Sequence, residues 1–418
     1  MAGFAYIQVF LLCVFHYVDK FTIWKKYLYF GGNMIGVGII GSGAIAQVHA
    51  SAFKEFGDRC EVRAVCDLFV DKAQDLIEKN GFKNAKAYKE IDELLSLKGI
   101  DVISICLPPS THAEASIKSL EAGKHVLVEK PMATSLAECD AMIAAAEKSG
   151  KVLSPVAQNR FKTPNYRVKT MLKEGKAGKV LYAAINSLWW RGTNYHDIWW
   201  RGTWDNECGG CVTSQAVHHL DLTLWMLGRP DQVTAIITNV AHDNSECEDL
   251  GIAILEYPGM LAQFTASIVN HDELQELVFQ TERGRLSVPW STAASKALPN
   301  GFPQEDSETK ESLQKLYESI PALKIEGHPA QVQNFLSAIE GKESLAITGN
   351  DGRASLELIM AIYKSAQTRQ TVKLPIANND VFYSKESWTK AMTRFHQKTR
   401  SVENFATSEI TLGRNVGR

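Results

Sequence analysis

The fold is decided by the stretch Ile35-Gly-Val-Gly-Ile-Ile-Gly-Ser-Gly-Ala-Ile-Ala46. Its first six residues are apolar and partly β-branched, a pattern typical of a short buried strand. A glycine-rich turn follows at once, and the spacing of His49, Phe53 and Phe56 indicates that the chain continues as a helix. A strand that leads through glycines into a helix predicts the first unit of a parallel α/β sheet.

The turn has the pattern Gly41-x-Gly43-x-x-Ala46, in which each position has a physical role. Gly41 permits a tight turn, Gly43 lets the backbone approach a pyrophosphate, and Ala46 lets the helix pack closely on the strand. The helix N-terminus presents unpaired N–H groups and the positive end of its dipole to the phosphates. We therefore expect a dinucleotide to contact Gly41, Ser42, Gly43, Ala44 and Ile45.

Asp67 follows a second predicted strand, Cys60–Cys66, at about the distance expected of a ribose-binding acid. A carboxylate at this position accepts hydrogen bonds from both ribose hydroxyls and repels a 2′-phosphate. The sequence therefore predicts NAD as the cofactor and disfavours NADP. The alternative is a glycine turn that binds no ligand.

Strands and helices alternate through the first part of the chain. Predicted helices cover residues 72–79, 92–97, 111–122 and 136–148, and further predicted strands cover residues 87–88, 102–106 and 125–128. Short loops join these elements, which predicts parallel strands with right-handed crossovers. We expect a Rossmann dinucleotide-binding domain over residues 34–157.

The pattern changes after about residue 160. Predicted strands cover residues 181–190, 232–240, 250–257, 261–269, 274–281, 285–288 and 371–375, and predicted helices cover residues 330–339 and 353–368. Consecutive strands joined by short turns favour an open, mostly antiparallel sheet. We expect a C-terminal α+β domain over residues 158–375 and an appended polar tail over residues 376–418, with one helix near residues 384–398.

Composition narrows the class of protein. The 418 residues carry 45 Lys and Arg against 47 Asp and Glu, a net charge of −2, which argues against a nucleic-acid partner. Hydrophobic residues at 45% and charged residues at 22% are typical of a globular protein. Eight cysteines are too few for a disulfide scaffold in a chain of this length, so we expect free thiols and a cytoplasmic location.

Residues 1–33 differ from the rest of the chain. The uncharged apolar run from Phe4 to Val18 is shorter than the roughly 20 residues that span a bilayer. Lys20, Lys25 and Lys26 follow it, with Trp24 among them, so one interpretation is a membrane-surface anchor. We favour the other interpretation, an extension outside the fold that precedes a start at Met34.

Two segments carry candidate catalytic side chains. Lys130 follows the predicted strand 125–128, and ligands of open α/β sheets bind beyond the carboxyl ends of the strands. Ser214, His218 and Asp221 are spaced to share one face of a helix. A lysine can steady a developing alkoxide, and a histidine can take a proton. The pair Cys208-x-x-Cys211 is a weak zinc signal without a second pair, and we expect no metal.

A tryptophan-rich echo lies between these segments, Trp189-Trp-Arg-Gly-Thr193 and Trp199-Trp-Arg-Gly-Thr203. Indole faces pack against the apolar face of a pyranose ring, and neighbouring polar groups such as Arg201 and His196 can take its hydroxyls. The alternative is an aromatic core or a subunit interface, where Trp and Arg are also enriched. Both interpretations stay open at this point.

The chain resembles the Gfo/Idh/MocA family, which includes glucose–fructose oxidoreductase and inositol dehydrogenase. The resemblance covers residues 34–375 and rests on motifs that occur in the family's order. These are the glycine turn, Glu129-Lys130-Pro131, Gln158-Asn-Arg-Phe161, Trp200-Arg-Gly-Thr203, the helix with His218 and Asp221, and His328-Pro-Ala-Gln-Val-Gln-Asn-Phe335. It implies an oligomer built through the open sheet of the second domain.

The resemblance also implies site residues. Lys130 and His218 are the implied catalytic pair. The cofactor is implied to contact Leu107, Pro108, His112, Glu129, Lys130, Gln158, Trp200 and Arg201, and the substrate to contact Lys130, Arg160, Tyr195, His196, Ser214 and His218. Two departures matter: Ser214 stands where many members have Asp, and Cys208 replaces the first of three glycines.

These observations favour an NAD-dependent dehydrogenase that oxidises a ring secondary hydroxyl of a sugar, glycoside or cyclitol, with position 3 of a glycoside as one option. The partner is then a small molecule, not a nucleic acid or a membrane. An alternative is a glycosidase that oxidises its sugar transiently with NAD and eliminates the aglycone. A further alternative is an NAD-binding sensor without turnover, prompted by Ser214 and Cys208.

Overall fold

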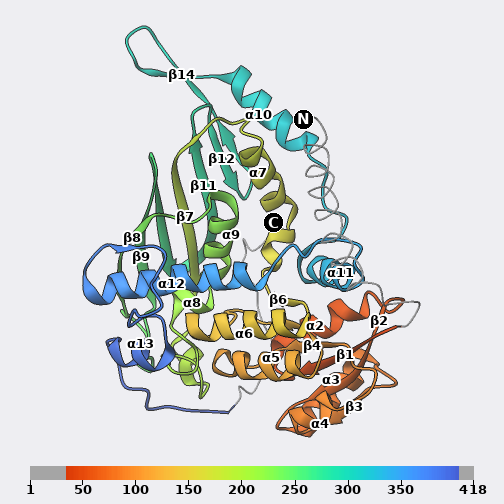
Figure 1. The fold of residues 1–418 in the computed structure, drawn as a ribbon. Coiled ribbons are helices and arrows are strands. Elements are labelled where there is room, and N and C mark those ends of the chain that lie inside the picture. Colours follow the sequence, from red (N-terminus) through yellow and green to blue (C-terminus); the bar gives the residue numbers. More distant parts are fainter. Residues whose placement is uncertain (1–33, 404–418) are drawn as a thin grey trace, which may run out of the picture.

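The computed structural model describes residues 34–403, which are built around two large sheets (Figure 1). The two expectations for residues 1–33 lie outside the described residues. Within residues 34–403, no helix combines the length and the apolar character that crossing a membrane requires.

The first sheet is the predicted Rossmann sheet. Its six strands are parallel and lie in the order β3-β2-β1-β4-β5-β6. The elements are β1 (Ile35–Ile40), α2 (Ala44–Lys54), β2 (Cys60–Cys66), α3 (Val70–Asn80), β3 (Lys86–Tyr88), α4 (Ile91–Leu95), β4 (Val102–Ile105), α5 (His112–Glu121), β5 (His125–Val128), α6 (Leu136–Ser149) and β6 (Leu153–Pro155). The strand order reverses between β1 and β4, where such sheets bind ligands.

The second sheet has eight strands in the order β13-β12-β11-β7-β10-β9-β8-β16. They are β7 (Val180–Trp190), β8 (Gln232–Thr238), β9 (Leu250–Tyr257), β10 (Met260–Ser267), β11 (Val269–Thr281), β12 (Arg285–Val288), β13 (Thr292–Ala293) and β16 (Val372–Lys373). All neighbours are antiparallel except β10 and β7, so the predicted open, mostly antiparallel sheet is confirmed. Helices α8 (Cys211–Ser214) and α9 (Val217–Leu227) lie between β7 and β8 in the chain.

Some elements have no counterpart in the sequence-based prediction. Helix α7 (Thr163–Lys173) follows the Rossmann domain, and a hairpin of β14 (Ser295–Ala297) and β15 (Pro303–Glu305) extends from the body ahead of α10 (Ser307–Ser319) (Figure 1). Polar, exposed side chains dominate the hairpin, so it lacks the apolar alternation by which half-buried strands are recognised.

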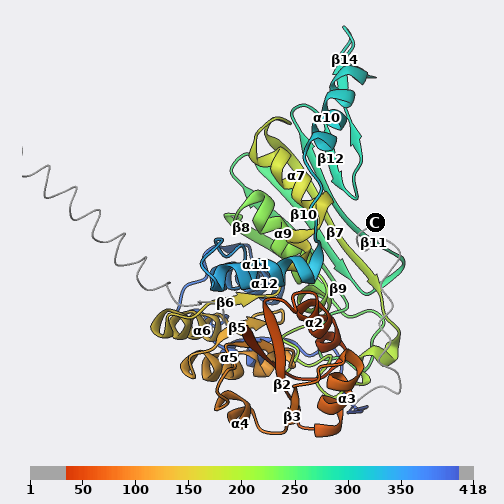
Figure 2. The same cartoon turned by 90° about the vertical axis from the view of Figure 1, so that its right-hand side faces the viewer.

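Two helices in the C-terminal part of the chain connect the two domains. Helix α11 (Gly327–Ile339) lies beside α2, and α12 (Gly349–Thr368) crosses between the sheets (Figures 1 and 2). Phe335 and Leu336 of α11 belong to the same buried cluster as Val37 and Ile39 of β1. The boundary predicted from sequence therefore assigns to the second domain a helix that packs in the core of the first.

The structure corrects the expectation of an appended tail for residues 376–403. Trp388 of α13 (Lys385–Ala391) is fully buried, and its indole N–H donates to the carbonyl of Thr134 at 2.9 Å. Val402 forms a β-bridge with Ile198. Ile376, Phe382 and Met392 are also buried in the core, so this segment packs on the body of the protein although most of its residues are polar.

Candidate functional site

The glycine turn has the geometry that a dinucleotide needs. Gly41 has φ of +90°, and a Cβ there would lie 2.5 Å from the carbonyl oxygen of Cys106, so only glycine fits. A Cβ on Gly43 would meet nothing within 4 Å, which leaves room for a ligand beside the backbone. No side chain caps α2, so its first N–H groups remain available for phosphate oxygens.

Asp67 lies at the edge of this turn. Its Oδ2 atom accepts hydrogen bonds from the backbone N–H of Ser42 at 2.8 Å and from the Ser42 hydroxyl at 2.6 Å. Its Oδ1 atom accepts from the backbone N–H of Phe69 at 2.9 Å. These contacts orient the carboxylate next to the glycine turn, where it can also accept from ribose hydroxyls.

His112 braces the loops that flank the predicted site. Its two ring nitrogens lie 2.8 Å from the carbonyl oxygen of Leu107 and 2.8 Å from that of Pro131. The ring is fully buried, and burial lowers the pKa of His112. His112 therefore connects the loop of Leu107 and Pro108 to the residue after Lys130, instead of lining the cofactor site.

Glu129 is held from two sides. Its Oε1 atom lies 2.9 Å from Nε2 of His49, and its Oε2 atom accepts from the backbone N–H of Lys130 at 3.1 Å. Burial by itself would raise the pKa of Glu129, but His49 and Lys130 lower it below its usual range. No local sequence pattern gives His49 a role, because only the fold places α2 against the end of β5.

His328 joins His49 and Glu129 in a cluster of metal-ligand type, in which the ligand atoms lie within 4.8 Å of one another. The contacts within the cluster favour an ion pair over a metal site. Nε2 of His49 is already bonded to Glu129, and its Nδ1 lies 2.7 Å from the hydroxyl of Ser104. The carboxylate of Glu129 is therefore balanced by an imidazole that lies within hydrogen-bond distance of it.

The predicted catalytic pair meets at one pocket. Lys130 and His218 both line one pocket, and Asp221, on the same helix as His218, lines it too. The Lys130 ammonium donates to the carbonyl oxygen of Ser214 at 3.1 Å. Burial lowers the pKa of Lys130, and Glu129 opposes this shift. Burial, together with the positive charge of Lys130, lowers the pKa of His218 well below its usual value.

Ser214 and Tyr195 belong to a hydrogen-bond chain beside this pocket. The Ser214 hydroxyl lies 2.7 Å from the carbonyl oxygen of Gly210 and 2.5 Å from Oε1 of Gln215. Nε2 of Gln215 donates to the Tyr195 hydroxyl at 2.9 Å. The guanidinium of Arg201 also donates to the Tyr195 hydroxyl. Gln215 was missed by sequence analysis, although it follows Ser214 directly.

Arg201 is held between aromatic rings. Its guanidinium carbon lies 4.1 Å from the ring centre of Tyr195 and 4.4 Å from that of Trp200. Glu207 accepts from Arg201 at 3.0 Å and from the backbone N–H of Gly202 at 2.6 Å. The buried Nε of Arg201 and the buried Oε1 of Gln158 lack hydrogen-bond partners among residues 34–403, which suits two residues expected to contact a cofactor.

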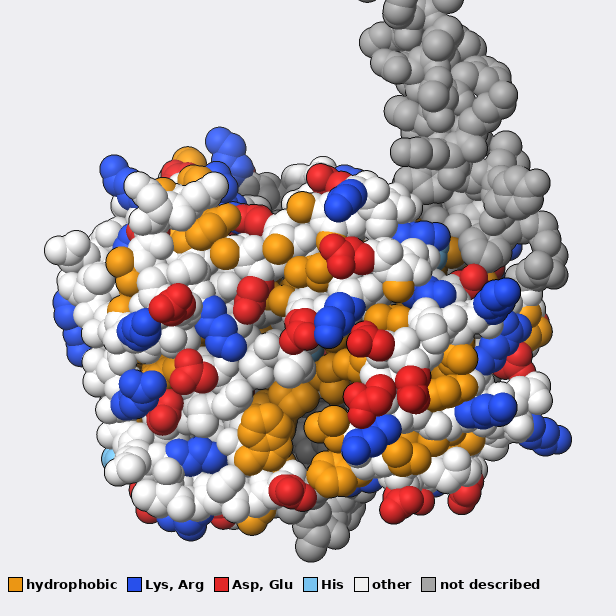
Figure 3. All heavy atoms as spheres, turned by 60° about the horizontal axis from the view of Figure 1, so that its bottom comes forward, with side chains coloured by type: hydrophobic (Ala, Val, Ile, Leu, Met, Phe, Trp, Pro, Cys, Tyr) orange, Lys and Arg blue, Asp and Glu red, His pale blue; other side chains and the backbone are white. Residues whose placement is uncertain are grey.

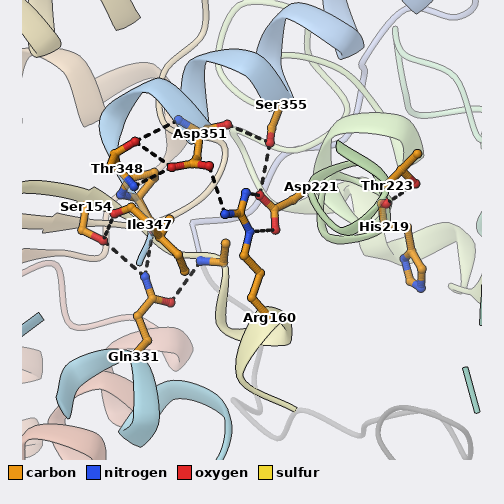
Figure 4. A network of polar contacts seen from close by, with 12 residues as sticks. Ser154, Arg160, His219, Asp221, Thr223, Gln331, Ile347, Thr348, Asp351 and Ser355 are labelled. Atoms are coloured by element: carbon orange, nitrogen blue, oxygen red, sulfur yellow. Dashed lines mark hydrogen bonds and ion pairs between the residues drawn. The ribbon is translucent and has the colours of Figure 1, made fainter. Parts of the chain in front are cut away.

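Arg160 does not lie open to a substrate as expected (Figure 4). Its guanidinium donates to Asp221 at 2.6 and 2.9 Å and to Asp351 at 3.0 Å, and its side chain is 7% exposed. Asp351 caps the start of α12 through reciprocal bonds with Thr348. The ion-paired group joins the segment after β6, the helix of His218 and α12. Arg160 therefore links three segments that line the pocket.

His196 also departs from expectation. It is 1% exposed and stacks edge-on against Tyr195 and His242, with ring centres 5.2 and 5.0 Å apart. Burial lowers the pKa of His196 to about 3. A ring in this position can support Tyr195 but is not available to a sugar hydroxyl.

The tryptophans of this stretch differ in burial. Trp204 is fully buried and Trp189 nearly so, as an aromatic core requires. Trp190 and Trp199 are 46% and 44% exposed.

Cys208 and Cys211 are both fully buried, and the thiol of Cys208 donates to the carbonyl of Thr134 at 3.4 Å.

Charged side chains do not gather into a single positive field on the face shown in Figure 3, where basic and acidic side chains alternate around a hollow rimmed by hydrophobic ones. A nucleic-acid site would instead concentrate basic side chains along one stripe. Among the described residues, the face drawn in Figure 3 therefore carries no continuous basic stripe.

Comparisons with known proteins place the chain. The family described as "Oxidoreductase family, NAD-binding Rossmann fold" matches residues 35–156, and the "GFO/IDH/MocA C-terminal domain" matches residues 166–287. The chain is 24% identical to the myo-inositol 2-dehydrogenase of Thermotoga maritima over 81% of this chain and 98% of that one. It is 28% identical to the D-glucoside 3-dehydrogenase of Escherichia coli over 81% of this chain and 97% of that one.

A solved dehydrogenase structure is also similar to this chain. The WlbA dehydrogenase of Bordetella pertussis, crystallised with NADH and UDP-GlcNAcA, superimposes with a TM-score of 0.72 at 26% identity, over 84% of this chain and 100% of that one. The Rossmann sheet, the glycine turn with Asp67 and the paired Lys130 and His218 are thus found in a chain whose two domains both match one family. The protein belongs to the NAD-dependent oxidoreductases of the Gfo/Idh/MocA family.

Proposed function

We propose that the protein oxidises a secondary hydroxyl on the ring of a sugar, glycoside or cyclitol. One observation carries this proposal: Lys130 and His218 line one pocket, beyond the carboxyl end of β5 in the sheet that carries the glycine turn. That arrangement can activate a hydroxyl next to a bound nicotinamide, which supplies the hydride acceptor.

His218 and Lys130 have different tasks in this scheme. The lowered pKa of His218 keeps its imidazole unprotonated at neutral pH, so it can take the hydroxyl proton as a general base. The ammonium of Lys130 donates a hydrogen bond to the same oxygen as negative charge develops on it. The carbon that carries the oxygen loses a hydride to the cofactor, and the product is a ketone.

The substrate class follows from the site and from the relatives. The Tyr195 hydroxyl accepts hydrogen bonds from Arg201 and Gln215, so its own hydrogen can be donated to a hydroxyl of a sugar ring. The two relatives named above act on inositol and on glucosides. Among ring positions we favour position 3 of a glycoside, with cyclitols as the other class to test.

The test is NADH absorbance with a panel of sugars, glycosides and inositols, with NAD and NADP in parallel. We expect NADH to accumulate with one substrate class. Release of an aglycone without net NADH would contradict a dehydrogenase and indicate transient oxidation instead. NAD bound tightly by a protein that turns over no polyol would indicate a sensor.

We also propose that the outer face of the eight-stranded sheet joins copies of this chain. Along β9 alternate side chains are buried, yet the exposed ones include Ile252 and Ile254, at 47% and 38% exposure. Ile236 on β8 and Leu261 on β10, the two strands that neighbour β9, are more than half exposed, and Ile236 pairs with Ile252. A contiguous apolar patch on a sheet is typical of an interface. The double variant Ile252→Asp/Ile254→Lys should give a smaller species in sedimentation, and an unchanged mass would contradict the proposal.

The state of the cysteines supports a cytoplasmic location. All seven cysteines among residues 34–403 are buried free thiols. Free thiols persist where the environment is reducing. Fractionation of cells that express the full chain tests this location.

A further inference from the structure

Glu248 is a buried acid that the reaction described above does not use. It is fully buried just before β9, and no basic side chain among residues 34–403 hydrogen-bonds or ion-pairs with it. Burying a carboxyl group without a counter-charge is costly, so such a group needs a structural reason. Its contacts supply one.

Both carboxyl oxygens of Glu248 accept hydrogen bonds from the turn around Gly210, which leads into α8 and then into α9, the helix of His218. Oε2 accepts from the backbone N–H of Gly210 at 3.0 Å, and Oε1 accepts from that of Val212 at 3.0 Å. The hydroxyl of Tyr363 on α12 lies 2.9 Å from Oε1. The acid thus joins the turn to α12.

The turn itself is strained. Cys208 has φ of +71°, a conformation that a side chain disfavours. A Cβ on Gly209 would lie 1.9 Å from the Tyr363 hydroxyl, and a Cβ on Gly210 would lie 1.8 Å from the carbonyl oxygen of Glu248. Strain of this kind persists only where surrounding contacts determine the conformation. Glu248 and Tyr363 provide those contacts, and they explain why two glycines precede the helix.

The position of the turn reaches the catalytic pair through the backbone. The carbonyl oxygen of Gly210 accepts from the N–H of Ser214 at 2.9 Å. The carbonyl oxygen of Ser214 in turn accepts from the ammonium of Lys130 at 3.1 Å. His218 follows one helical turn later, so a shift of the turn moves Lys130 and His218 relative to each other.

We propose that Glu248 is a positioning residue for Lys130 and His218, and that it holds the turn best when its carboxyl group carries a proton. The number of hydrogens available for the neighbouring hydrogen bonds supports the second statement, that the carboxyl group carries a proton. Three contacts follow one another: Glu248 Oε1 to Tyr363 Oη at 2.9 Å, Tyr363 Oη to Thr213 Oγ1 at 2.8 Å, and Thr213 Oγ1 to the carbonyl of Cys208 at 2.9 Å. The two hydroxyl groups supply two hydrogens for three contacts. A proton on Glu248 supplies the third.

The electrostatic surroundings support this count. Burial raises the pKa of Glu248 to about 7, although the N–H groups of Val212 and Gly210 and the Tyr363 hydroxyl oppose the shift. The other titratable groups that face it are Cys208, Cys211, Cys247 and Tyr363, and burial raises the pKa of each well above its usual value. These neighbours therefore stay neutral, and Glu248 alone among them changes charge near neutrality.

The inference rests on the proposed dehydrogenase function for its kinetic part, so the experiment has a second part that needs no turnover. The variants are Glu248→Gln, Glu248→Ala and Tyr363→Phe. Glu256→Gln, at the other end of β9, is the matched control. Hydrogen exchange of the backbone between residues 206 and 220 reports the turn directly, and NAD affinity reports the separate glycine turn.

We expect Glu248→Ala to lower kcat by about 10- to 100-fold through misplacement of the pair, with little change in Kd for NAD. Glutamine keeps the volume, but its amide can accept a hydrogen bond at one atom only, so one backbone N–H is released. Glu248→Gln should therefore lower kcat severalfold and remove the change in protection of the turn that the wild type shows between about pH 6 and 8. Tyr363→Phe should also raise exchange in the turn.

Two outcomes would overturn the inference. One is wild-type exchange in the turn for a folded Glu248→Gln and Tyr363→Phe protein, whatever the turnover. The other is the same pH dependence of exchange in the wild type and in Glu248→Gln. If no variant and no wild-type protein turns over any polyol, the proposed function fails while the exchange measurement still decides the role of Glu248.

Discussion

The ammonium of Lys130 donates its hydrogen bond to the backbone carbonyl oxygen of Ser214 at 3.1 Å. The resemblance to the family suggested that many members have a carboxylate at this position. Here Lys130 faces a neutral carbonyl from the chain, and the Ser214 hydroxyl turns to Gly210 and Gln215. The charges closest to the pair therefore come from other residues, chiefly Glu129.

Ser214→Asp tests the effect of that missing charge. A carboxylate beside Lys130 favours the ammonium, so it should raise the pKa of Lys130 by about one unit or more. We expect the alkaline limb of the kcat/KM profile to move to higher pH by the same amount. Ser214→Asn is the uncharged control, and an equal shift in both variants would contradict the electrostatic cause.

Lys130 and His218 are expected to be needed for turnover. Lys130→Met and His218→Asn should each lower kcat by about 10²- to 10⁴-fold, because each removes a group that acts on the reacting oxygen. NAD affinity, measured by fluorescence titration, should stay close to that of the wild type. His271→Asn, an exposed histidine that stacks on Trp190, is the control. Near wild-type turnover of Lys130→Met would refute the proposed scheme.

Asp67 is expected to set the choice of cofactor. Asp67→Asn removes the charge that favours ribose hydroxyls, so kcat/KM with NAD should fall by about tenfold, in the range of hydrogen bonds to charged groups. Removal of the repulsion should raise kcat/KM with NADP. Steady-state rates with both cofactors measure the ratio, and Asp71→Asn in the first turn of α3 serves as the control. An unchanged ratio would separate Asp67 from cofactor choice.

The ion-paired group of Arg160 is expected to matter for stability. Arg160→Met leaves Asp221, which is 5% exposed, without its partner, and should reduce the free energy of unfolding by about 3–5 kcal/mol. The double variant Arg160→Met/Asp221→Leu also removes the unpaired carboxylate, so it should recover much of the lost free energy of unfolding. Urea unfolding at neutral pH measures both. A double variant no more stable than Arg160→Met would show that the cost is one of packing.

The pair of His49 and Glu129 predicts a pH dependence of stability. Burial lowers the pKa of His49, but Cys106 and Glu129 outweigh burial and raise it to about 10. A raised pKa in the folded state stabilises fully below the unfolded value of about 6.5, and this contribution is lost as pH rises toward about 10. The lowered pKa of Glu129 acts in the other direction, so its contribution is lost as pH falls below about 4.3.

His49→Asn checks that sign. The difference in unfolding free energy between wild type and variant should be largest between about pH 5 and 6.5 and should shrink toward about pH 9.5. Urea unfolding across this range measures it. A difference that grows with pH would mean that the imidazole is neutral in the folded protein.

Much of the fold could be predicted from local sequence patterns. The Rossmann elements were found because a buried strand, a glycine turn and an amphipathic helix each have a signature over a few neighbouring residues. The hairpin of β14 and β15 has no such signature, because its side chains are exposed on both faces. The packing of residues 376–403 was missed for a related reason: isolated anchors such as Trp388 show no period.

The amino-acid sequence by itself determined the class of fold and the cofactor, because a buried strand, a glycine turn and an acid after the next strand are local patterns. Through the resemblance to the family, its motifs also pointed to Lys130 and His218 as the proposed catalytic pair. Only the tertiary structure decided the surroundings of that pair. Arg160 pairs with Asp221 and Asp351, and Glu248 holds Gly210 and Val212, across separations of up to 191 residues. Burial and charge at the site depend on such distant partners, and no local pattern encodes which distant segments will meet.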